Sequence, residues 1–238
     1  MEKISVVIAA RNEETRIGEV LAVLVTHPLI DDVVVMCDNC SDKTAEVARG
    51  FGVHVIEERE RLGKTSAVKQ GLEYAKNDIL ILLDADLKGL TQQDITRLVM
   101  PVIDGQVDFT LSMRGNSSHI YKFFGIDFVS GERALSKRLL RDPHIWSKPD
   151  LGYGLEVLMN ESLIKARRTF LSVPMPGLHA TTKKEKKSYI VGTLEDFFMT
   201  FNIFRALPVY KVVWQFLKMS YLGRKYRKDR LRYSEQLS

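Results

Sequence analysis

The chain contains only two cysteines, Cys37 and Cys40, in 238 residues. Two cysteines cannot cross-link a secreted scaffold of this length, so we expect a reducing compartment. Two thiols also cannot complete a four-ligand zinc site. Their C-x-x-C spacing leaves a thioredoxin-like redox motif as an alternative, which requires a helix that begins at the motif.

Long apolar runs are absent as well. No stretch of 18 apolar residues occurs, so no membrane-spanning helix is predicted, and residues 1–4 lack the apolar core of a signal peptide. We therefore expect a cytoplasmic protein. The composition, 45% hydrophobic and 27% charged, is ordinary for a folded protein and argues against disorder as the main state.

The first half of the chain alternates short apolar runs with amphipathic segments. The runs are short and nearly continuous, as in strands buried on both faces, and lie at residues 4–10, 32–36, 53–56 and 79–83. The segments between them carry apolar residues at helical spacing, and Ser41 is the expected N-cap of the second one. This order predicts an α/β fold whose mainly parallel sheet is flanked by helices, with ligands beyond the carboxyl ends of the strands.

The pattern changes after residue 90. Thr91 and Asp94 predict a helix N-terminal capping box. The remaining expectations are a half-buried strand at 107–112, irregular chain at 114–130, a helix through Leu135 and Leu139, a helix bearing Glu156 and a strand at 169–175.

Two carboxylates, Asp84 and Asp86, follow the fourth apolar run. Residues two apart on an extended chain face the same way, and two adjacent carboxylates repel unless a cation lies between them. Mg²⁺ and Mn²⁺ prefer such oxygen ligands and bind diphosphates. The pair predicts a metal site that holds a diphosphate. The alternatives are an acidic turn and a D-x-D phosphatase with Asp84 as its nucleophile, although that motif usually follows the first strand.

Four segments in order resemble the family-two glycosyltransferases and their relatives with the GT-A fold, among them polyprenyl-phosphate sugar transferases and glucosyl-3-phosphoglycerate synthases. They are residues 6–14, 38–44, 61–67 and 83–86. The match thins afterwards, although residues 130–133 and 152–156 lie where the family keeps acceptor-side segments.

The resemblance implies roles for individual residues. The nucleotide and its diphosphate would be bound by Ala9, Arg11, Glu13, Asp38, Gly63, Lys64, Asp84, Ala85 and Asp86, with Asp38 accepting from the base. Asp84 and Asp86 would hold Mg²⁺ or Mn²⁺, and His179 would complete the metal site unless it is simply an exposed loop residue. The lysines at 183–187 either form a solvated loop or close over phosphates.

The catalytic candidates that the resemblance implies are Glu132, Glu156 and Asp84. A carboxylate would remove the acceptor proton in an inverting reaction, whereas a retaining reaction needs no such base on that face. Both outcomes stay open, and Glu132 could instead form a buried ion pair with Arg133 or Arg138.

Residues 205–238 hold nine basic and two acidic residues, a net charge of +7 in a chain whose total is +5. An aromatic, apolar stretch that begins near Pro208 precedes most of the basic residues. We expect a GT-A domain at 1–204 and a basic amphipathic helical tail at 205–238 that lies on the inner face of an anionic membrane. The alternative is a helix packed on the domain or on a second copy in a homo-oligomer. No nucleic-acid-binding module is present, so we expect no nucleic-acid partner.

The function that this reading predicts is metal-dependent transfer of a hexose from a nucleotide sugar, with UDP favoured, to a hydroxyl or phosphate acceptor. A polyprenyl phosphate would explain the tail, and a small phosphorylated acceptor would explain the basic loops. The alternative from another class is a non-catalytic nucleotide-binding or scaffold protein on the same fold.

Overall fold

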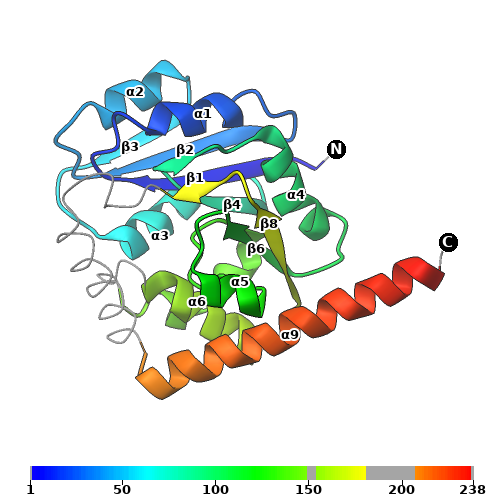
Figure 1. Cartoon of the computed structure of the whole chain (residues 1–238). Helices are drawn as coiled ribbons and strands as arrows, with labels where there is room; N and C mark the ends of the chain where they lie inside the picture. Colours follow the sequence, from blue (N-terminus) through cyan, green and yellow to red (C-terminus); the bar gives the residue numbers. More distant parts are fainter. Residues whose placement is uncertain (1, 149–153, 181–206, 237–238) are drawn as a thin grey trace.

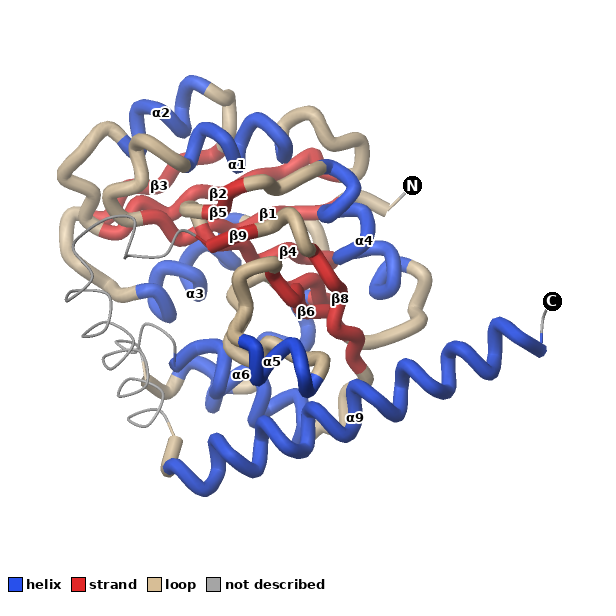
Figure 2. Tube along the Cα trace, viewed as in Figure 1, coloured by secondary structure: helices blue, strands red, loops and turns tan. Residues whose placement is uncertain are grey.

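The computed structural model describes residues 2–148, 154–180 and 207–236, the last ten of these as backbone only. Its centre is a seven-stranded sheet in the order β3-β2-β1-β4-β7-β6-β8 with helices on both faces (Figures 1 and 2). The strands are β1 (Ile4–Ala10), β2 (Ile30–Asp38), β3 (His54–Glu58), β4 (Ile79–Asp84), β6 (Phe109–Arg114), β7 (Arg133–Ser136) and β8 (Phe170–Met175). The helices are α1 (Ile17–Leu24), α2 (Thr44–Gly50), α3 (Lys64–Tyr74), α4 (Gln92–Ile103), α5 (His119–Phe124), α6 (Gly154–Lys165) and α9 (Val209–Gln236).

The βα alternation of the first half is confirmed. Strands β3, β2, β1 and β4 are parallel neighbours, so their carboxyl ends share one edge of the sheet. The apolar residues at helical spacing in α1 are all buried, namely Ile17, Val20, Leu21 and Leu24. Thr91 and Asp94 form the expected capping box at the start of α4. The strand expected at 169–175 is β8.

Three expectations about secondary structure and capping are wrong. The segment predicted as a helix through Leu135 is strand β7, antiparallel between β4 and β6, and Leu139 lies in a short 3₁₀ turn (Lys137–Leu140). Ser41 does not cap α2, because the N-cap position of that helix is Lys43. The N–H and hydroxyl of Ser41 both donate to Asn12 Oδ1 instead. The stretch expected to be irregular at 114–130 contains α5.

Strand β6 is also not half-buried, since its polar residues Thr110 and Ser112 are fully covered. The Thr110 hydroxyl donates to the Leu98 carbonyl, and the Ser112 hydroxyl donates to Glu132 Oε2. Satisfied hydroxyls can therefore replace apolar side chains in a buried strand.

The sheet separates two apolar cores because successive side chains of a strand face opposite ways. Val6 and Ile8 of β1 join the core beneath α1 and α4, whereas Val7 joins the core shared with α3, α6 and α9. The second core is the floor below the candidate site.

The C-terminal helix packs against the body of the protein along its first half. Leu207, Val212 and Met219 are buried in the second core, and the Phe216 and Tyr226 rings pack against Phe128 and Phe170. The predicted amphipathic helix is present, and it lies along the lower edge of the molecule in Figure 1. The expected domain boundary at 204 lies outside the described residues. None of the described helices is both long and apolar enough to cross a membrane.

Candidate active site at the carboxyl edge of the sheet

The ends of β1, β2 and β4 bring three loops together. Asn12 and Asn39, just beyond β1 and β2, have positive φ angles of 55° and 52°, a conformation that Asn adopts more readily than most residues. The Asn12 side chain joins the two loops by accepting from the Ser41 N–H at 2.9 Å.

Asp38 is buried at the end of β2 and fixes the loop before α3. Its two carboxylate oxygens accept from the backbone N–H groups of Leu62 at 2.5 Å and Gly63 at 3.0 Å. Gly63 has φ +80° and precedes the first residue of α3, so the loop turns sharply at a position that favours glycine. In this structure Asp38 therefore positions the Gly63–Lys64 turn.

Lys64 connects two carboxylates from distant parts of the chain. Its Nζ lies 2.8 Å from Asp84 Oδ1 and 2.7 Å from Glu156 Oε1. The side chains of Lys64 and Asp84 are 26% and 22% exposed, and that of Glu156 is 3% exposed. A ligand could thus reach the ammonium and Asp84 from solvent, with Glu156 behind them.

The charges of this cluster are set by the same contacts. Burial disfavours the Lys64 ammonium, but Asp84 and Glu156 outweigh it and raise the pKa of Lys64. Burial likewise opposes ionisation of Asp84, yet attraction to Lys64 dominates and lowers the pKa of that carboxyl. Both groups are therefore charged at neutral pH.

Gly131 leaves the space that Asp84 occupies. A Cβ at this position would lie 2.7 Å from Asp84 Oδ2 and 2.8 Å from Oδ1. We expect Gly131→Ala to displace a carboxylate that Lys64 holds, which would lower the stability by about 1–3 kcal/mol and weaken donor binding. Urea unfolding and donor titration measure the two effects. Gly50→Ala is the control because a Cβ at Gly50 meets no atom within 4 Å; equal behaviour of the two variants would contradict the prediction.

A buried charge network lies behind the cluster. Glu132 is fully buried and accepts from the hydroxyls of Ser112 at 2.6 Å and Ser130 at 2.7 Å. Arg114 lies 3.6 Å from Glu132 and 3.3 Å from Asp127. These contacts favour a structural role for Glu132, and its ion-pair partner is Arg114.

Arg133 is the second guanidinium of this network and is only 1% exposed. It donates to Asn160 Oδ1 at 2.6 Å and to the carbonyls of Ser130 and Phe128 at 2.9 and 3.0 Å. Burial lowers the pKa of Arg133, an effect that the surrounding carboxylates oppose. The sequence reading did not give Arg114, Asp127 or Asn160 a role, because their significance arises from contacts between distant segments.

Asp86 and His179 lie near each other through a two-stranded ribbon. Strand β5 (Leu87–Lys88) pairs antiparallel with β9 (His179–Ala180), with Lys88 opposite His179. Asp86 lies in the turn just before β5, two residues from Lys88, the pairing partner of His179. His179 is exposed, and its Nε2 lies 3.4 Å from the Pro176 carbonyl. Among the described residues no group of three or more His, Cys, Asp or Glu side chains forms a ready metal site.

The other predicted positions surround this edge. Ala9 is half-buried at the end of β1 opposite Asp84 of β4, and Ala85 is buried. Arg11 is exposed, whereas Glu13 pairs with Arg16 at 2.5 Å. The lysines at 183–187 and residues 152–153 lie outside the described residues.

The C-x-x-C pair does not resemble a redox motif in its surroundings. The following helix begins at Thr44 rather than at the motif. Cys37 is buried in β2, and burial raises the pKa of its thiol to about 12. A thiol in that state is a poor nucleophile.

Solved structures share this architecture. A glucosyl-3-phosphoglycerate synthase from Mycobacterium tuberculosis, in complex with Mn²⁺, uridine diphosphate and phosphoglyceric acid, aligns with a TM-score of 0.66 and 21% identity over 86% of this chain and 78% of that one. The same enzyme with Mg²⁺ and uridine diphosphate aligns with a TM-score of 0.64 over 85% and 79%. At this identity the likeness shows the fold, which is the GT-A fold.

The family follows from the sequence comparison. The model of "Glycosyl transferase family 2" matches residues 5–133, more than half of the chain. The chain therefore belongs to glycosyl transferase family 2.

Curated relatives include 4,4'-diaponeurosporenoate glycosyltransferases of Staphylococcus aureus. That of strain RF122 / ET3-1 is 33% identical over 103 residues, which are 41% of this chain. That of strain USA300 is 34% identical over 101 residues, or 40% of this chain. The matches span 28% and 27% of the lengths of these two relatives.

Proposed function

We propose that the protein transfers a hexose from a nucleotide sugar, with a UDP-sugar favoured, to a hydroxyl or phosphate acceptor. The observation that carries the proposal is the Lys64 ammonium, which is held between Asp84 and Glu156 at the open edge of the sheet in a family 2 chain. A preorganised cation at this position suits the diphosphate of such a donor, because leaving-group charge develops there.

The donor would lie along the loops after β1, β2 and β3. Ala9, Arg11 and Glu13 would line the nucleotide pocket, and Asp38 would set the turn that presents Lys64. Glu156 Oε2 is buried and accepts no hydrogen bond from the described residues. A hydroxyl of the donor sugar would satisfy this oxygen, so we assign Glu156 to sugar binding and to holding Lys64.

Asp86 and His179 are the residues that would hold a divalent cation, with Mg²⁺ or Mn²⁺ as the expected metal. A carboxylate just before β5 and an imidazole on its partner strand β9 suit these metals, and the donor diphosphate would supply further oxygen ligands. Asp84 is paired with Lys64, so its place in the metal site would be behind Asp86. The cation would neutralise charge on the departing diphosphate.

On the proposed acceptor side, the carboxylate to be assigned is Glu132. Glu132 is enclosed by Ser112 and Ser130, so we assign it to the scaffold of the site rather than to proton transfer. The acceptor classes that we propose are a polyprenyl phosphate and a small phosphorylated molecule. The glycosyltransferase named for 4,4'-diaponeurosporenoate is a relative consistent with a lipid-like acceptor, and the synthase bound to phosphoglyceric acid is a structural neighbour consistent with a small phosphorylated one.

Removing the proposed metal ligand tests the function. We expect Asp86→Ala to lose metal-dependent affinity for a UDP-sugar by about 10²-fold, measured by calorimetric titration with and without Mn²⁺. The control is Asp104→Ala, which changes an acid at the end of α4, away from the site. Release of UDP from UDP-sugars is followed in parallel with GDP- and ADP-sugars.

The same panel separates the alternatives. A scaffold protein would bind nucleotide without releasing UDP from the sugar. A phosphatase would release phosphate from monoesters and would lose that activity in Asp84→Asn. No response to any nucleotide sugar would refute the proposed function.

A further inference from the structure

Helix α9 has a second apolar face that the described body of the protein does not cover. Six large side chains on this face are 51–70% exposed: Val209, Tyr210, Val213, Trp214, Leu217 and Tyr221. At about 100° per residue they span an arc of about 140° on the helix surface. The remaining arc holds the buried residues Val212, Gln215 and Met219. One face of α9 therefore stabilises the fold, and the other presents apolar surface to solvent.

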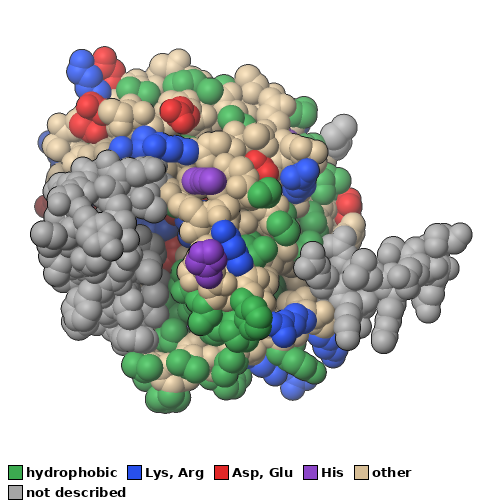
Figure 3. Space-filling model, viewed as in Figure 1, with side chains coloured by type: hydrophobic (Ala, Val, Ile, Leu, Met, Phe, Trp, Pro, Cys, Tyr) green, Lys and Arg blue, Asp and Glu red, His purple; other side chains and the backbone are tan. Residues whose placement is uncertain are grey.

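Helix α5 extends this exposed surface. Its Ile120 and Phe123 are 55% and 78% exposed. The neighbouring Phe124 ring lies 5.0 Å from that of Phe216, and the Arg224 guanidinium lies 5.6 Å from the Phe124 centroid, so α5 borders the exposed side of α9. Figure 3 shows apolar side chains gathered over the lower front of the molecule, with Lys and Arg beside them. We call Ile120, Phe123 and the six exposed residues of α9 the α5–α9 face.

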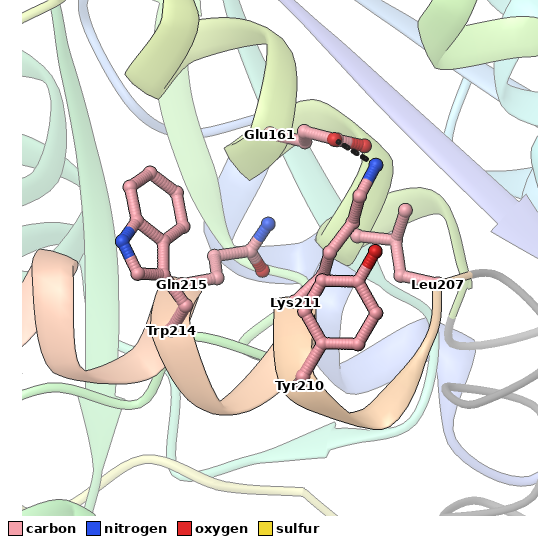
Figure 4. Close-up of a pocket in the computed structure, with 6 residues that line it drawn as sticks. All are labelled: Glu161, Leu207, Tyr210, Lys211, Trp214 and Gln215. Carbon is pink, nitrogen blue, oxygen red and sulfur yellow. Dashed lines mark hydrogen bonds and ion pairs between the residues drawn. The ribbon is translucent and has the colours of Figure 1, made fainter.

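The charge beside this face is of one sign. Residues 209–226 contain four basic residues and no acidic residue, and Lys218, Arg224 and Lys225 are exposed. An apolar pocket of about 460 Å³ opens between α6 and α9, next to Tyr210 and Trp214 (Figure 4). Its one carboxylate, Glu161, pairs with Lys211 and Lys165 at 3.1 and 3.2 Å and with His144 at 2.8 Å. The acid is thus neutralised by its neighbours.

We propose that the α5–α9 face docks on an anionic lipid surface. Tyr and Trp side chains favour the boundary between headgroups and acyl chains, and basic side chains beside them attract anionic headgroups. A second copy of the chain is a poorer occupant, because the same basic residues would face one another across the contact. Docking of this face does not depend on the proposed function; only the link from the face to a lipid-borne acceptor rests on it.

Vesicle flotation of the full chain tests the face directly. We expect the protein to float with vesicles of equimolar phosphatidylglycerol and phosphatidylcholine, and much less with phosphatidylcholine alone. Trp214→Glu/Leu217→Glu should lower binding by about tenfold or more, because two apolar anchors are replaced by anions. Lys218→Glu/Lys225→Glu should lower it by about fivefold or more through the loss of headgroup attraction.

Matched controls separate docking from misfolding and from catalysis. Val25→Glu changes an apolar residue that is 43% exposed and directly follows α1, outside the face, and should leave flotation unchanged. The melting temperature and the release of UDP from UDP-glucose are measured without vesicles, so a failed donor reaction is distinguishable from failed docking. Point variants are used because α9 contributes Val212 and Met219 to the core.

Three outcomes would overturn the inference. The first is a wild-type chain that stays at the bottom of the gradient while the anionic vesicles float, and the second is Trp214→Glu/Leu217→Glu floating as well as Val25→Glu. A wild-type dimer in light scattering that becomes a monomer in Trp214→Glu/Leu217→Glu would identify a second copy as the occupant.

Discussion

We expect Lys64→Met to lower kcat/KM for the proposed glycosyl transfer by about 10²–10³-fold, the range for loss of a preorganised cation at the leaving group. The methionine keeps most of the apolar stem but removes the ammonium that Asp84 and Glu156 hold. The loss should fall on both kcat and the affinity for the UDP-sugar. Steady-state kinetics and direct titration of the donor measure the two parts.

The control for this variant is Lys69→Met, which removes an exposed lysine of the same helix. Loss of Lys64 also removes the ammonium that lies between Asp84 and Glu156, so some destabilisation is expected. Lys64→Met/Asp84→Asn should recover stability without recovering transfer, which separates folding from function. Unchanged donor affinity and turnover in Lys64→Met would exclude the proposed role.

Arg133→Met should cost about 3–5 kcal/mol of unfolding free energy, the range for breaking a buried charge network on one side. Arg133 is 1% exposed and satisfies Asn160 and two backbone carbonyls. Methionine fills part of the volume but cannot donate to these oxygens. Urea unfolding followed by circular dichroism measures the change.

Arg141→Met provides the comparison, because Arg141 is exposed beyond the 3₁₀ turn. We expect its unfolding free energy to stay within about 0.5 kcal/mol of the wild type. A similar result for Arg133→Met would show that the buried network contributes little to stability.

The donor half of the fold could be predicted from the sequence because its signals are local. Apolar runs such as residues 4–10 mark parallel strands by composition alone, and the polar residues that end them share one edge by topology. Asp84 was placed correctly at the end of β4 for this reason. The contact of Lys64 with Glu156 could not be read in the same way, since these two residues lie 92 positions apart in the chain.

The acceptor half was harder because its structure depends on neighbours. Strand β7 has four residues and is specified by pairing with β4 and β6, which a local helical pattern through Leu135 does not reveal. Glu132 is a carboxylate of the kind that could act in catalysis, yet the hydroxyls of two serines donate to it in the buried interior. Burial of that kind arises only when β6 and β7 are in register.

The tail shows the limit of reading amphipathicity from one chain. Its apolar residues predicted a helix that lies on a membrane or, alternatively, packs on the domain; the helix has two apolar faces, one of them packed through Met219 into the core. A hydrophobic stripe in the sequence does not show which face of the helix will pack into the core of the protein.

The short β5–β9 ribbon would make affinity for the proposed cation a reporter of long-range order. Among the described residues, two pairs join Leu87–Lys88 to His179–Ala180, and they bring together segments about ninety positions apart. The carboxylate of Asp86 belongs to the early part of the chain, whereas the imidazole of His179 arrives only after β8 has paired with β6. During synthesis, nucleotide contacts could therefore form well before a divalent ion gains both ligands. A substitution that loosens β8 would first weaken metal binding and only later unfold the sheet.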